Sequence, residues 1–389
     1  MLWSRAFLAV LGAQFLSAIA DNALLFAALA VVKGDHYAVW TAPLLQEFFV
    51  AAYIVLAPFA GPFSDALPKG RVMLICNGIK ALGAGGMLLG FNPFLAYGLV
   101  GLGAAAYSPA KYGILSELTA PAQLVKANSW MESSTIAAIL IGAVAGGTLS
   151  DWSVPGALVL VVACYGAAAG ANLMIPRGRV ERCAANLSLF ALSRGFVAAC
   201  RTLWRLPDAR FSVIGTSLFW GGASTMRFLL VAWVPVALGI ATNRMPAYLT
   251  GMVAVGIIVG ALMAARFITV ERADRAMPAG MLIGVALFLL AGTGNLGVAF
   301  ALMLVLGACG GFYVVPLNAL LQKRGHETVG AGNAIALQNL ADNAFMLVMT
   351  GLYTVVAHAQ VGVRVTAIVF GVGLSAAIGA LWWHRARVG

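Results

Sequence analysis

Long apolar runs recur from one end of the chain to the other, separated by short polar segments. A helix needs about 20 apolar residues to cross the hydrocarbon core of a bilayer, and the alternating ten-residue pattern of a membrane β-barrel is absent from the sequence. The pattern therefore predicts an all-α membrane protein with twelve transmembrane helices. The predicted spans are residues 6–32, 43–63, 72–91, 94–115, 128–150, 155–175, 211–240, 247–267, 278–293, 296–321, 331–357 and 363–383.

The first span contains a polar stretch, SAIADN at residues 17–22, that allows two interpretations. Arg5, the apolar residues after it and the small-residue pattern at 18–20 are typical of a cleaved signal peptide. Cleavage there would leave residues 23–32, which are too few to span a membrane. We therefore favour the second interpretation, in which Asp21 is an ionisable group held inside the membrane for a function.

The longest polar interruption, residues 176–210, separates six predicted spans from six. We expect an N-terminal six-helix bundle at 1–175, a linker at 176–210 and a C-terminal six-helix bundle at 211–389. Within the linker, apolar residues from 187 to 204 recur at helical spacing, while Arg194, Arg201 and Arg205 fall on another face. Such an amphipathic helix either lies on the inner leaflet, with its arginines at anionic head groups, or is a solvated linker.

The two halves carry a weak internal repeat. The fourth span ends in YSPAKYGIL (107–115) and the tenth in VVPLNALL (314–321), and each is followed by a loop and an asparagine, Asn128 or Asn333. Parallel repeats of this kind are typical of transporters whose halves rock against each other. The spacings Gly142-x-x-x-Gly146 and Gly256-x-x-x-Gly260 suit close helix packing, although spacings of this kind arise easily by chance among 45 glycines.

Composition supports a membrane protein, since 62% hydrophobic residues, 10% charged residues and a mean hydropathy of +0.94 exclude a soluble globular chain. The net charge of +11 is mainly a signal of topology. With the N-terminus inside, all but five of the 24 lysines and arginines lie on the inner side, so we expect both termini in the cytoplasm. The five exceptions are Lys33, Arg244 and Arg364 in outer loops, and Lys80 and Arg227 within spans.

Several other functions find no support in the sequence. Basic residues spread over short loops are a poor footprint for nucleic acid. The Walker A, His-Glu-x-x-His and Gly-x-Ser-x-Gly motifs do not occur, and the four histidines do not cluster, so we expect no enzyme, no metal site and no cofactor. The five cysteines are scattered, and Cys183 and Cys200 fall in the predicted cytoplasmic linker, so we expect no disulfide framework.

Ionisable residues inside predicted spans are the main candidates for function. Each would be costly facing lipid and is expected to face a cavity or a partner. They are Asp21, Lys80, Glu132, Arg227 and Asp342. When the first and seventh spans are aligned, Asp21 and Arg227 stand at nearly the same depth in opposite halves. Such charges can pair in one conformation, can meet the two ends of a zwitterionic substrate, or can serve only to fix the helix register.

The segment GPFSDALPKGR, residues 61–71, resembles the Gly-x-x-x-Asp…Gly-Arg signature of the major facilitator superfamily. The spacing between Asp65 and Gly70 is longer than the usual form, and the equivalent segment at 260–264 lacks the aspartate. The resemblance implies a gate, and we expect Asp65, Lys69 and Arg71 to form a latch on the cytoplasmic side. There Asp65 caps the end of a span and the cations reach neighbouring helix termini.

Three longer segments, 14–26, 104–115 and 125–140, look like those of bacterial lysophospholipid transporters, and the likeness runs over nearly the whole chain. The SPAKYGIL core at 108–115 is also shared with transporter domains fused to acyltransferases. The resemblance implies inward flipping of lysophosphatidylethanolamine and lysophosphatidylglycerol across the inner membrane of a Gram-negative bacterium. A cytoplasmic-side acyltransferase and acyl-acyl-carrier-protein synthetase would then reacylate them.

On that interpretation different candidate residues bind different groups of a lysophospholipid. Arg227 and Lys111 would take the phosphate and Asp21 the ammonium, with hydrogen bonds from Asn22, Tyr107 and Tyr112. The alternative is a proton-coupled drug exporter of the same superfamily, in which Asp21 or Asp342 would titrate. A membrane scaffold without transport would leave the buried charges unexplained.

Overall fold

The computed structural model describes residues 4–34, 42–176, 189–240 and 244–388. These residues form thirteen α-helices and two short 3₁₀-helices, and they contain no strand. The first six α-helices are α1 (Arg5–Gly34), α2 (Ala42–Ala66), α3 (Lys69–Leu88), α4 (Pro93–Leu118), α5 (Leu124–Trp152) and α6 (Val154–Leu173). The others are α7 (Leu189–Arg205), α8 (Pro207–Leu238), α9 (Arg244–Phe267), α10 (Met277–Gly292), α11 (Leu296–Thr328), α12 (Ala331–His358) and α13 (Val363–Val388). The 3₁₀-helices η2 (Pro121–Gln123) and η3 (Val270–Ala276) precede α5 and α10.

The all-helical class is confirmed, and every predicted span coincides with one long helix, α1 to α6 or α8 to α13. By length and composition alone, nine helical segments of the described chain can cross a membrane. Helices α3, α4 and α12 do not meet that criterion. Helices α3 and α12 carry charged and amide side chains in their interior, and α4 carries Lys111 and Glu117 near its C-terminal end. The amphipathic helix expected in the linker is α7.

Local chemistry accounts for several helix ends. Helix α4 begins at Pro93, and the side chain of Asn92 accepts hydrogen bonds from the backbone N–H groups of the next turn, at 3.0 and 3.2 Å. Ser153 caps α6 in the same way, at 3.1 Å from the N–H of Gly156. A polar cap accepts hydrogen bonds from N–H groups that a helix start leaves unpaired, and a proline in the first turn has no N–H group to pair. Helix α8 ends at Gly239, whose φ of 67° suits glycine.

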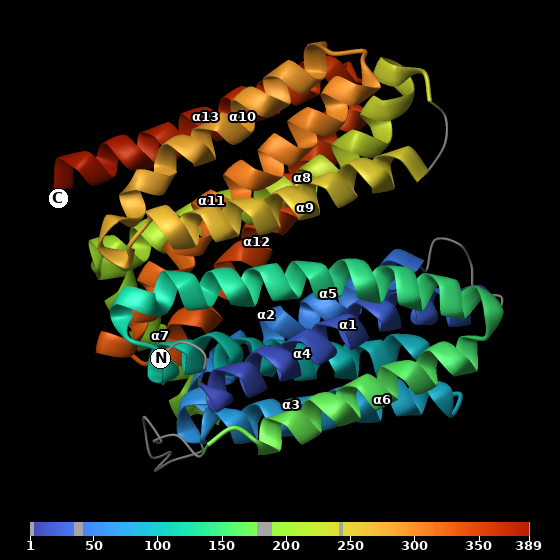
Figure 1. Ribbon diagram of the computed structural model, residues 1–389, viewed down its shortest axis with the longest axis vertical. Coiled ribbons are helices and arrows are strands. Elements are labelled where there is room, and N and C mark those ends of the chain that lie inside the picture. The colour runs from blue at the N-terminus through green and yellow to red at the C-terminus, as the bar shows by residue number, and fades with distance from the viewer. Residues whose placement is uncertain (1–3, 35–41, 177–188, 241–243, 389) are drawn as a thin grey trace. The chain divides into compact units, whose positions relative to one another are not determined.

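The chain divides into two compact units. The first unit comprises Met1–Pro121, Ala137–Leu203 and Gln322–Leu340, and the second comprises Ala122–Ile136, Trp204–Leu321 and Ala341–Gly389. In the first unit α1 packs on α6, and α4 packs on α2 and α3; in the second, α13 packs on α10 and α8 (Figure 1). The first unit therefore includes the beginning of α12, and the second includes the beginning of α5.

Both small-residue spacings mark close helix crossings. Gly142 and Gly146 of α5 lie against the backbone of α1 at Ile19 and Ala23. Gly256 and Gly260 of α9 lie against the backbone of α11, at Leu304 and Ala308. A Cβ atom at any of the four glycines would meet backbone atoms, which cannot move as a flexible side chain can. The spacing thus identifies two helix pairs whose backbones touch.

The crossing of α9 and α11 leads to a stability prediction. We expect Gly260→Ala to destabilise the protein by about 1–3 kcal/mol, because the added methyl group must push the two backbones apart. Thermal unfolding of the detergent-purified protein measures the effect. Gly251→Ala, on the same helix, is the matched control, since a Cβ there has nothing within 4 Å. Equal melting temperatures for the two variants would contradict the proposed packing.

Candidate functional site

A buried ion pair in the first unit holds the carboxylate of Asp21. Lys80 Nζ, on α3, lies 2.9 Å from Asp21 Oδ2, and the hydroxyl of Tyr165, on α6, donates to Asp21 Oδ1 at 2.7 Å. Both carboxylate oxygens therefore have a partner from another helix. The side chain of Lys80 is 1% exposed and that of Asp21 is 25% exposed. The ammonium group of the pair is thus buried, while the aspartate side chain is partly exposed.

Further polar groups surround the lysine. Lys80 Nζ also donates to Ser17 Oγ at 3.1 Å, and Ser17 donates in turn to Asn77 Oδ1 at 2.8 Å. The ring centres of Tyr107 and Tyr165 lie 4.7 and 5.7 Å from Nζ. An ammonium group removed from water needs such hydrogen bonds and π-faces to offset the cost of its burial. The cluster therefore joins α1, α3, α4 and α6 through one buried positive charge.

Helical spacing explains how the sequence builds this cluster. Ser17 and Asp21 are four residues apart on α1, and Asn77 and Lys80 are three apart on α3, so each pair lies on one helix face. The amide of Asn22, by contrast, donates to the carbonyl of Ala18 on its own helix, at 2.8 Å. Asn22 is therefore beside the ion pair in sequence but bonded within α1.

Of the other predicted substrate residues, Tyr107 belongs to the cluster around Lys80, Lys111 and Tyr112 lie farther along α4, and Arg227 lies on α8. Lys111 is 8% exposed, and its Nζ lies 4.1 Å from the ring centre of the neighbouring Tyr112. Tyr107, one helical turn before Lys111, is 3% exposed. Arg227 is exposed on α8, in the second unit. The expected facing of Asp21 and Arg227 stays a prediction, whereas Lys80 is a partner of Asp21 that the sequence analysis did not assign.

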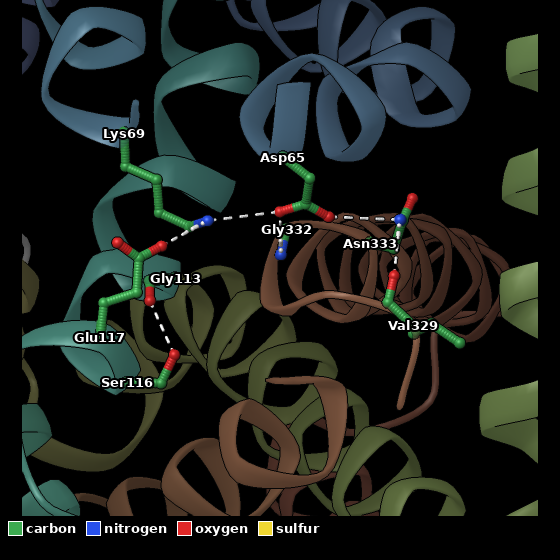
Figure 2. Close-up of polar contacts among 8 residues, drawn as sticks. All are labelled: Asp65, Lys69, Gly113, Ser116, Glu117, Val329, Gly332 and Asn333. Atoms are coloured by element: carbon green, nitrogen blue, oxygen red, sulfur yellow. Dashed lines mark hydrogen bonds and ion pairs between the residues drawn. The ribbon is translucent and has the colours of Figure 1, made fainter. Parts of the chain in front are cut away.

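Asp65 joins α2 to the start of α12, as Figure 2 shows. Its Oδ1 accepts a hydrogen bond from the backbone N–H of Gly332 at 3.1 Å, and its Oδ2 accepts from Asn333 Nδ2 at 3.3 Å. Because α12 begins at Ala331, the carboxylate lies at the positive end of that helix, where the N–H groups are unpaired. We call this contact the α2–α12 joint.

Lys69 extends the α2–α12 joint to α4. Its Nζ lies 3.4 Å from Asp65 Oδ1 and 2.7 Å from Glu117 Oε1, so it bridges two carboxylates (Figure 2). The structure thus brings Asp65 and Lys69 together, as the latch hypothesis expects. Arg71 is exposed, and no ion pair links it to another residue in the part of the chain that the structure describes.

Two glycines make the α2–α12 joint possible. A Cβ atom at Gly61 would lie 2.8 Å from Asn333 Cα, and one at Gly332 would lie 2.5 Å from Asp65 Oδ1. Both distances are shorter than any real Cβ contact, so only glycine allows the two backbones to approach. The Gly-x-x-x-Asp spacing therefore has a physical meaning here, because Gly61 admits α12 and Asp65 binds its N-terminus.

The second unit holds the contacts of the beginning of α5. Ser129 Oγ donates to the carbonyl of Ala261, near the end of α9, at 2.6 Å. Asn318 Nδ2, on α11, donates to Glu132 Oε1 at 3.3 Å. The segment at 260–264 lacks an aspartate, and a neutral hydroxyl–carbonyl bond occurs there instead. The repeat is also visible locally, since Asn128 and Asn333 each donate to the carbonyl four residues earlier, both at 3.0 Å.

Asp342 is the other buried acid of the second unit. It lies on α12 and is 6% exposed, and its Oδ1 accepts hydrogen bonds from Thr216 at 3.0 Å and Ser217 at 2.9 Å, both on α8. In the described ranges, no group of three or more His, Cys, Asp or Glu side chains is placed to hold a metal ion. The carboxylates of Asp65, Glu132 and Asp342 accept hydrogen bonds from lysine, amide, hydroxyl or backbone donors.

Comparison with known proteins identifies the family. The model of the Major Facilitator Superfamily matches residues 10–341. The chain belongs to this superfamily. Its members are transporters, and the chain is accordingly a transporter rather than an enzyme. The twelve long helices and the weak repeat of the two halves agree with this assignment.

Two sets of relatives are similar over almost the full length. The chain is 56% identical to the Lysophospholipid transporter LplT of Klebsiella pneumoniae, over 99% of this chain and 98% of that protein. It is 54% identical to the Lysophospholipid transporter LplT of Escherichia coli O1:K1, over 99% of this chain and 97% of that protein. These likenesses cover both six-helix halves and the linker between them.

Solved structures show the same fold at low sequence identity. The transporter FucP in the outward conformation has a TM-score of 0.74 at 15% identity, with 97% of this chain and 98% of that chain covered. The human organic anion transporter MFSD10 (TETRAN) has a TM-score of 0.78 at 15% identity, with 98% and 99% covered. At this level of identity the likeness establishes the fold alone.

Several partners in these sites were not assigned from the sequence. Tyr165 and Glu117 carry no local pattern that points to Asp21 or Lys69, because the contacts join different helices. In the sequence Asn333 enters the internal repeat, and Gly332 stands directly before it. Both residues stand at the start of a predicted span, and Asp65 stands at the end of another. This combination is the sequence signal that could have indicated the contact.

The Asp21–Lys80 pair allows a direct test. We expect Lys80→Met to lower the free energy of unfolding by about 3 kcal/mol, the lower end of the range for a broken buried pair, because Asp21 is partly open to solvent. The double variant Asp21→Asn with Lys80→Met should regain most of that stability. Thermal unfolding in detergent measures both.

Lys126→Met is the control, because Lys126 is an exposed lysine on α5. If Lys80→Met melted at the same temperature as Lys126→Met, the ion pair would not stabilise the first unit. If the double variant were less stable than Lys80→Met, the loss would arise from packing rather than from an unpaired carboxylate.

Proposed function

We propose that the chain carries lysophospholipids across the bacterial inner membrane, from the outer to the inner leaflet, by alternating access. The observation that carries the proposal is the 56% identity, over 99% of the chain, to a relative named as a lysophospholipid transporter. The superfamily fold supplies two helical halves that exchange access between the membrane sides. The polar clusters inside these helices supply groups for a charged head group.

Asp21 is the proposed contact for a head-group ammonium. Its carboxylate is fixed by Lys80 and Tyr165, yet a quarter of the side chain remains exposed. A substrate cation can therefore reach the open side without first breaking the bonds on the closed side. Lys80, in this proposal, is a positioning residue that holds the carboxylate of Asp21 in its orientation. Hydrogen bonds from Tyr107 and Asn22 belong to the same proposal.

Arg227 and Lys111 are the proposed contacts for the phosphate. Arg227 is exposed on α8, and a guanidinium can bind two phosphate oxygens at once. Lys111 is buried beside Tyr112, and its ammonium would act as a single point of positive charge. Opposite charges supplied by separate helices suit a zwitterion such as the head group of lysophosphatidylethanolamine. An anionic lysolipid would use the two cations alone.

The α2–α12 joint is the proposed gate. Three donors converge on the carboxylate of Asp65, one of them a helix N-terminus, and the two glycines hold the backbones together there. A transporter that alternates between two states must break this joint in one of them. On the proposed topology, with both termini in the cytoplasm, the joint closes the cytoplasmic side. The transported lysophospholipid would be released on that side to a lysophospholipid acyltransferase and acyl-acyl-carrier-protein synthetase.

The first test measures uptake of radiolabelled lysophosphatidylethanolamine into liposomes that contain the purified protein alone. We expect uptake by the wild type and little uptake of a two-chain phospholipid. Asp21→Asn and Arg227→Gln should each lower uptake about tenfold or more, because each removes a charge-assisted contact with the head group. The exchange Asp21→Arg with Arg227→Asp separates two roles, since rescue would indicate a gate pair and no rescue would indicate direct head-group contacts.

Three outcomes would decide against parts of this proposal. Equal transport of one-chain and two-chain lipids would rule out selectivity for lysolipids. Full uptake by both single variants would remove these residues from the mechanism. Export of a drug substrate driven by a proton gradient, without lysolipid uptake, would establish the proton-coupled exporter and would make Asp21 or Asp342 the titrating group to examine.

A second test concerns the gate. Asp65→Asn keeps the size of the side chain but removes its charge, so it should weaken the bonds to Gly332 and Lys69 by about 1.5–3 kcal/mol. We expect a lower rate of uptake with little change in lysolipid binding, since Asp65 lies outside the proposed binding site. Arg71→Gln tests whether Arg71 belongs to the latch. We expect it to lower the rate of uptake less than Asp65→Asn does, because Arg71 is exposed. Unchanged uptake by Asp65→Asn would show that the joint does not limit the cycle.

A further inference from the structure

Helix α7, which follows the first six long helices (Figure 1), packs onto the first unit through one stripe of apolar residues. Phe196, Ala199 and Leu203 are 3%, 5% and 1% exposed and recur at helical spacing. Phe196 forms a small core with Ala57 of α2 and Ala336 of α12. Burial on the same side raises the pKa of the Cys200 thiol to about 11. One face of α7 is therefore docked.

The docked face shares an apolar cluster with both helices of the α2–α12 joint. Ala57, Gly61 and Asp65 follow one another at four-residue spacing, so they form one face of α2. The same face meets Gly332 and Asn333 through Gly61 and Asp65, and it meets Phe196 through Ala57. Phe196 thus lies in one apolar cluster with a residue from each helix of the joint. Docking of α7 is therefore expected to favour the state in which α2 and α12 lie together.

The opposite surface of α7 combines exposed apolar and basic side chains. Val197 is 46% exposed and Trp204 is 49% exposed, and they lie on the same flank of the helix. Arg194, Arg201 and Arg205 are exposed beside that flank, and within the described ranges none of the three forms an ion pair. A tryptophan and an aliphatic residue next to arginines are typical of a helix lying at the membrane interface.

We propose that this surface binds the phosphate head groups of anionic phospholipids in the bilayer leaflet beside α7, and that lipid bound there stabilises the α2–α12 joint. The three arginines supply the charge for the phosphates, while Val197 and Trp204 enter the boundary between head groups and acyl chains. In a solvated linker helix, a half-exposed tryptophan beside an exposed valine would leave apolar surface in water. The surface is distinct from the head-group contacts proposed for transport.

The coupling follows from linkage. A ligand that binds the docked helix better than the undocked one shifts the equilibrium toward the docked state by its difference in affinity. Since Phe196 shares one apolar cluster with Ala57 of α2 and Ala336 of α12, we expect the docked helix to favour the closed joint. Anionic lipid is therefore expected to favour the closed joint, and neutral lipid to leave it easier to open.

Hydrogen–deuterium exchange of the full-length protein in lipid nanodiscs tests the proposal. Phosphatidylglycerol is increased stepwise in discs of phosphatidylcholine, and exchange is followed in α7 and in residues 331–340. We expect anionic lipid to slow exchange in both segments. Each Arg→Gln substitution at 194, 201 or 205 should raise the phosphatidylglycerol content needed for half of the effect, by about fivefold per residue and by about one hundredfold for the triple variant.

Two further variants separate lipid binding from coupling. The triple variant Arg266→Gln, Arg272→Gln and Arg275→Gln removes the same charge from exposed arginines outside α7, and it should respond to phosphatidylglycerol like the wild type. Phe196→Ala should keep the lipid response of α7 but lose the response of residues 331–340. A retained response in residues 331–340 of Phe196→Ala would overturn the coupling.

The identity of the occupant is tested in the same discs. Equal exchange of wild-type α7 with and without phosphatidylglycerol would overturn the lipid proposal. So would an unchanged response in the triple variant of Arg194, Arg201 and Arg205. Soluble polyglutamate serves as a probe for an acidic protein partner. Slower exchange of α7 with polyglutamate in neutral discs, but none with phosphatidylglycerol, would assign the surface to a protein and not to lipid.

Discussion

A charged side chain inside hydrocarbon must find its partners within the protein, and this constraint governs the interior of the transporter. Lipid tails offer no hydrogen bonds, so an ion that faced them would be strongly destabilising. Lys80 meets the constraint with a carboxylate, a hydroxyl and two aromatic rings supplied by three other helices. Each partner fixes a helix to the others, so satisfying one charge also sets the packing of α1, α3, α4 and α6.

The sequence predicts the helices well, because the length of an apolar run is a local property. It also identifies Asp21 and Asp65 as functional candidates, since a carboxylate within or at the end of a span is unusual by itself. It does not give their partners. The structure gives Asp21 the partners Lys80 and Tyr165, and only the packing of α1 against α3 and α6 reveals them. The relation of Asp21 to Arg227 stays a prediction.

The two repeats have diverged most clearly at their crossings between halves. One crossing places a carboxylate on the N-terminus of α12, with a lysine beside it. The other joins the beginning of α5 to α9 by a serine hydroxyl and a backbone carbonyl. A neutral bond of this kind depends little on the electrostatics around it, while the carboxylate responds to every nearby charge. The carboxylate of Asp65 therefore gives its contact an electrostatic control that the bond between Ser129 and Ala261 lacks. The buried carboxylate of Glu132 accepts instead from an amide of α11, three residues farther along α5.

The glycine contacts between α9 and α11 have a mechanical consequence. Gly256 and Gly260 meet the backbone of α11, and Gly307 and Gly311 meet the backbone of α9 in return. Helices separated by side chains can slide a little as rotamers change, but two backbones in direct contact have no such adjustable layer between them. The pair therefore behaves as a stiff lever. A displacement at one end of α9 is transmitted to α11 along its length instead of being absorbed between the two helices.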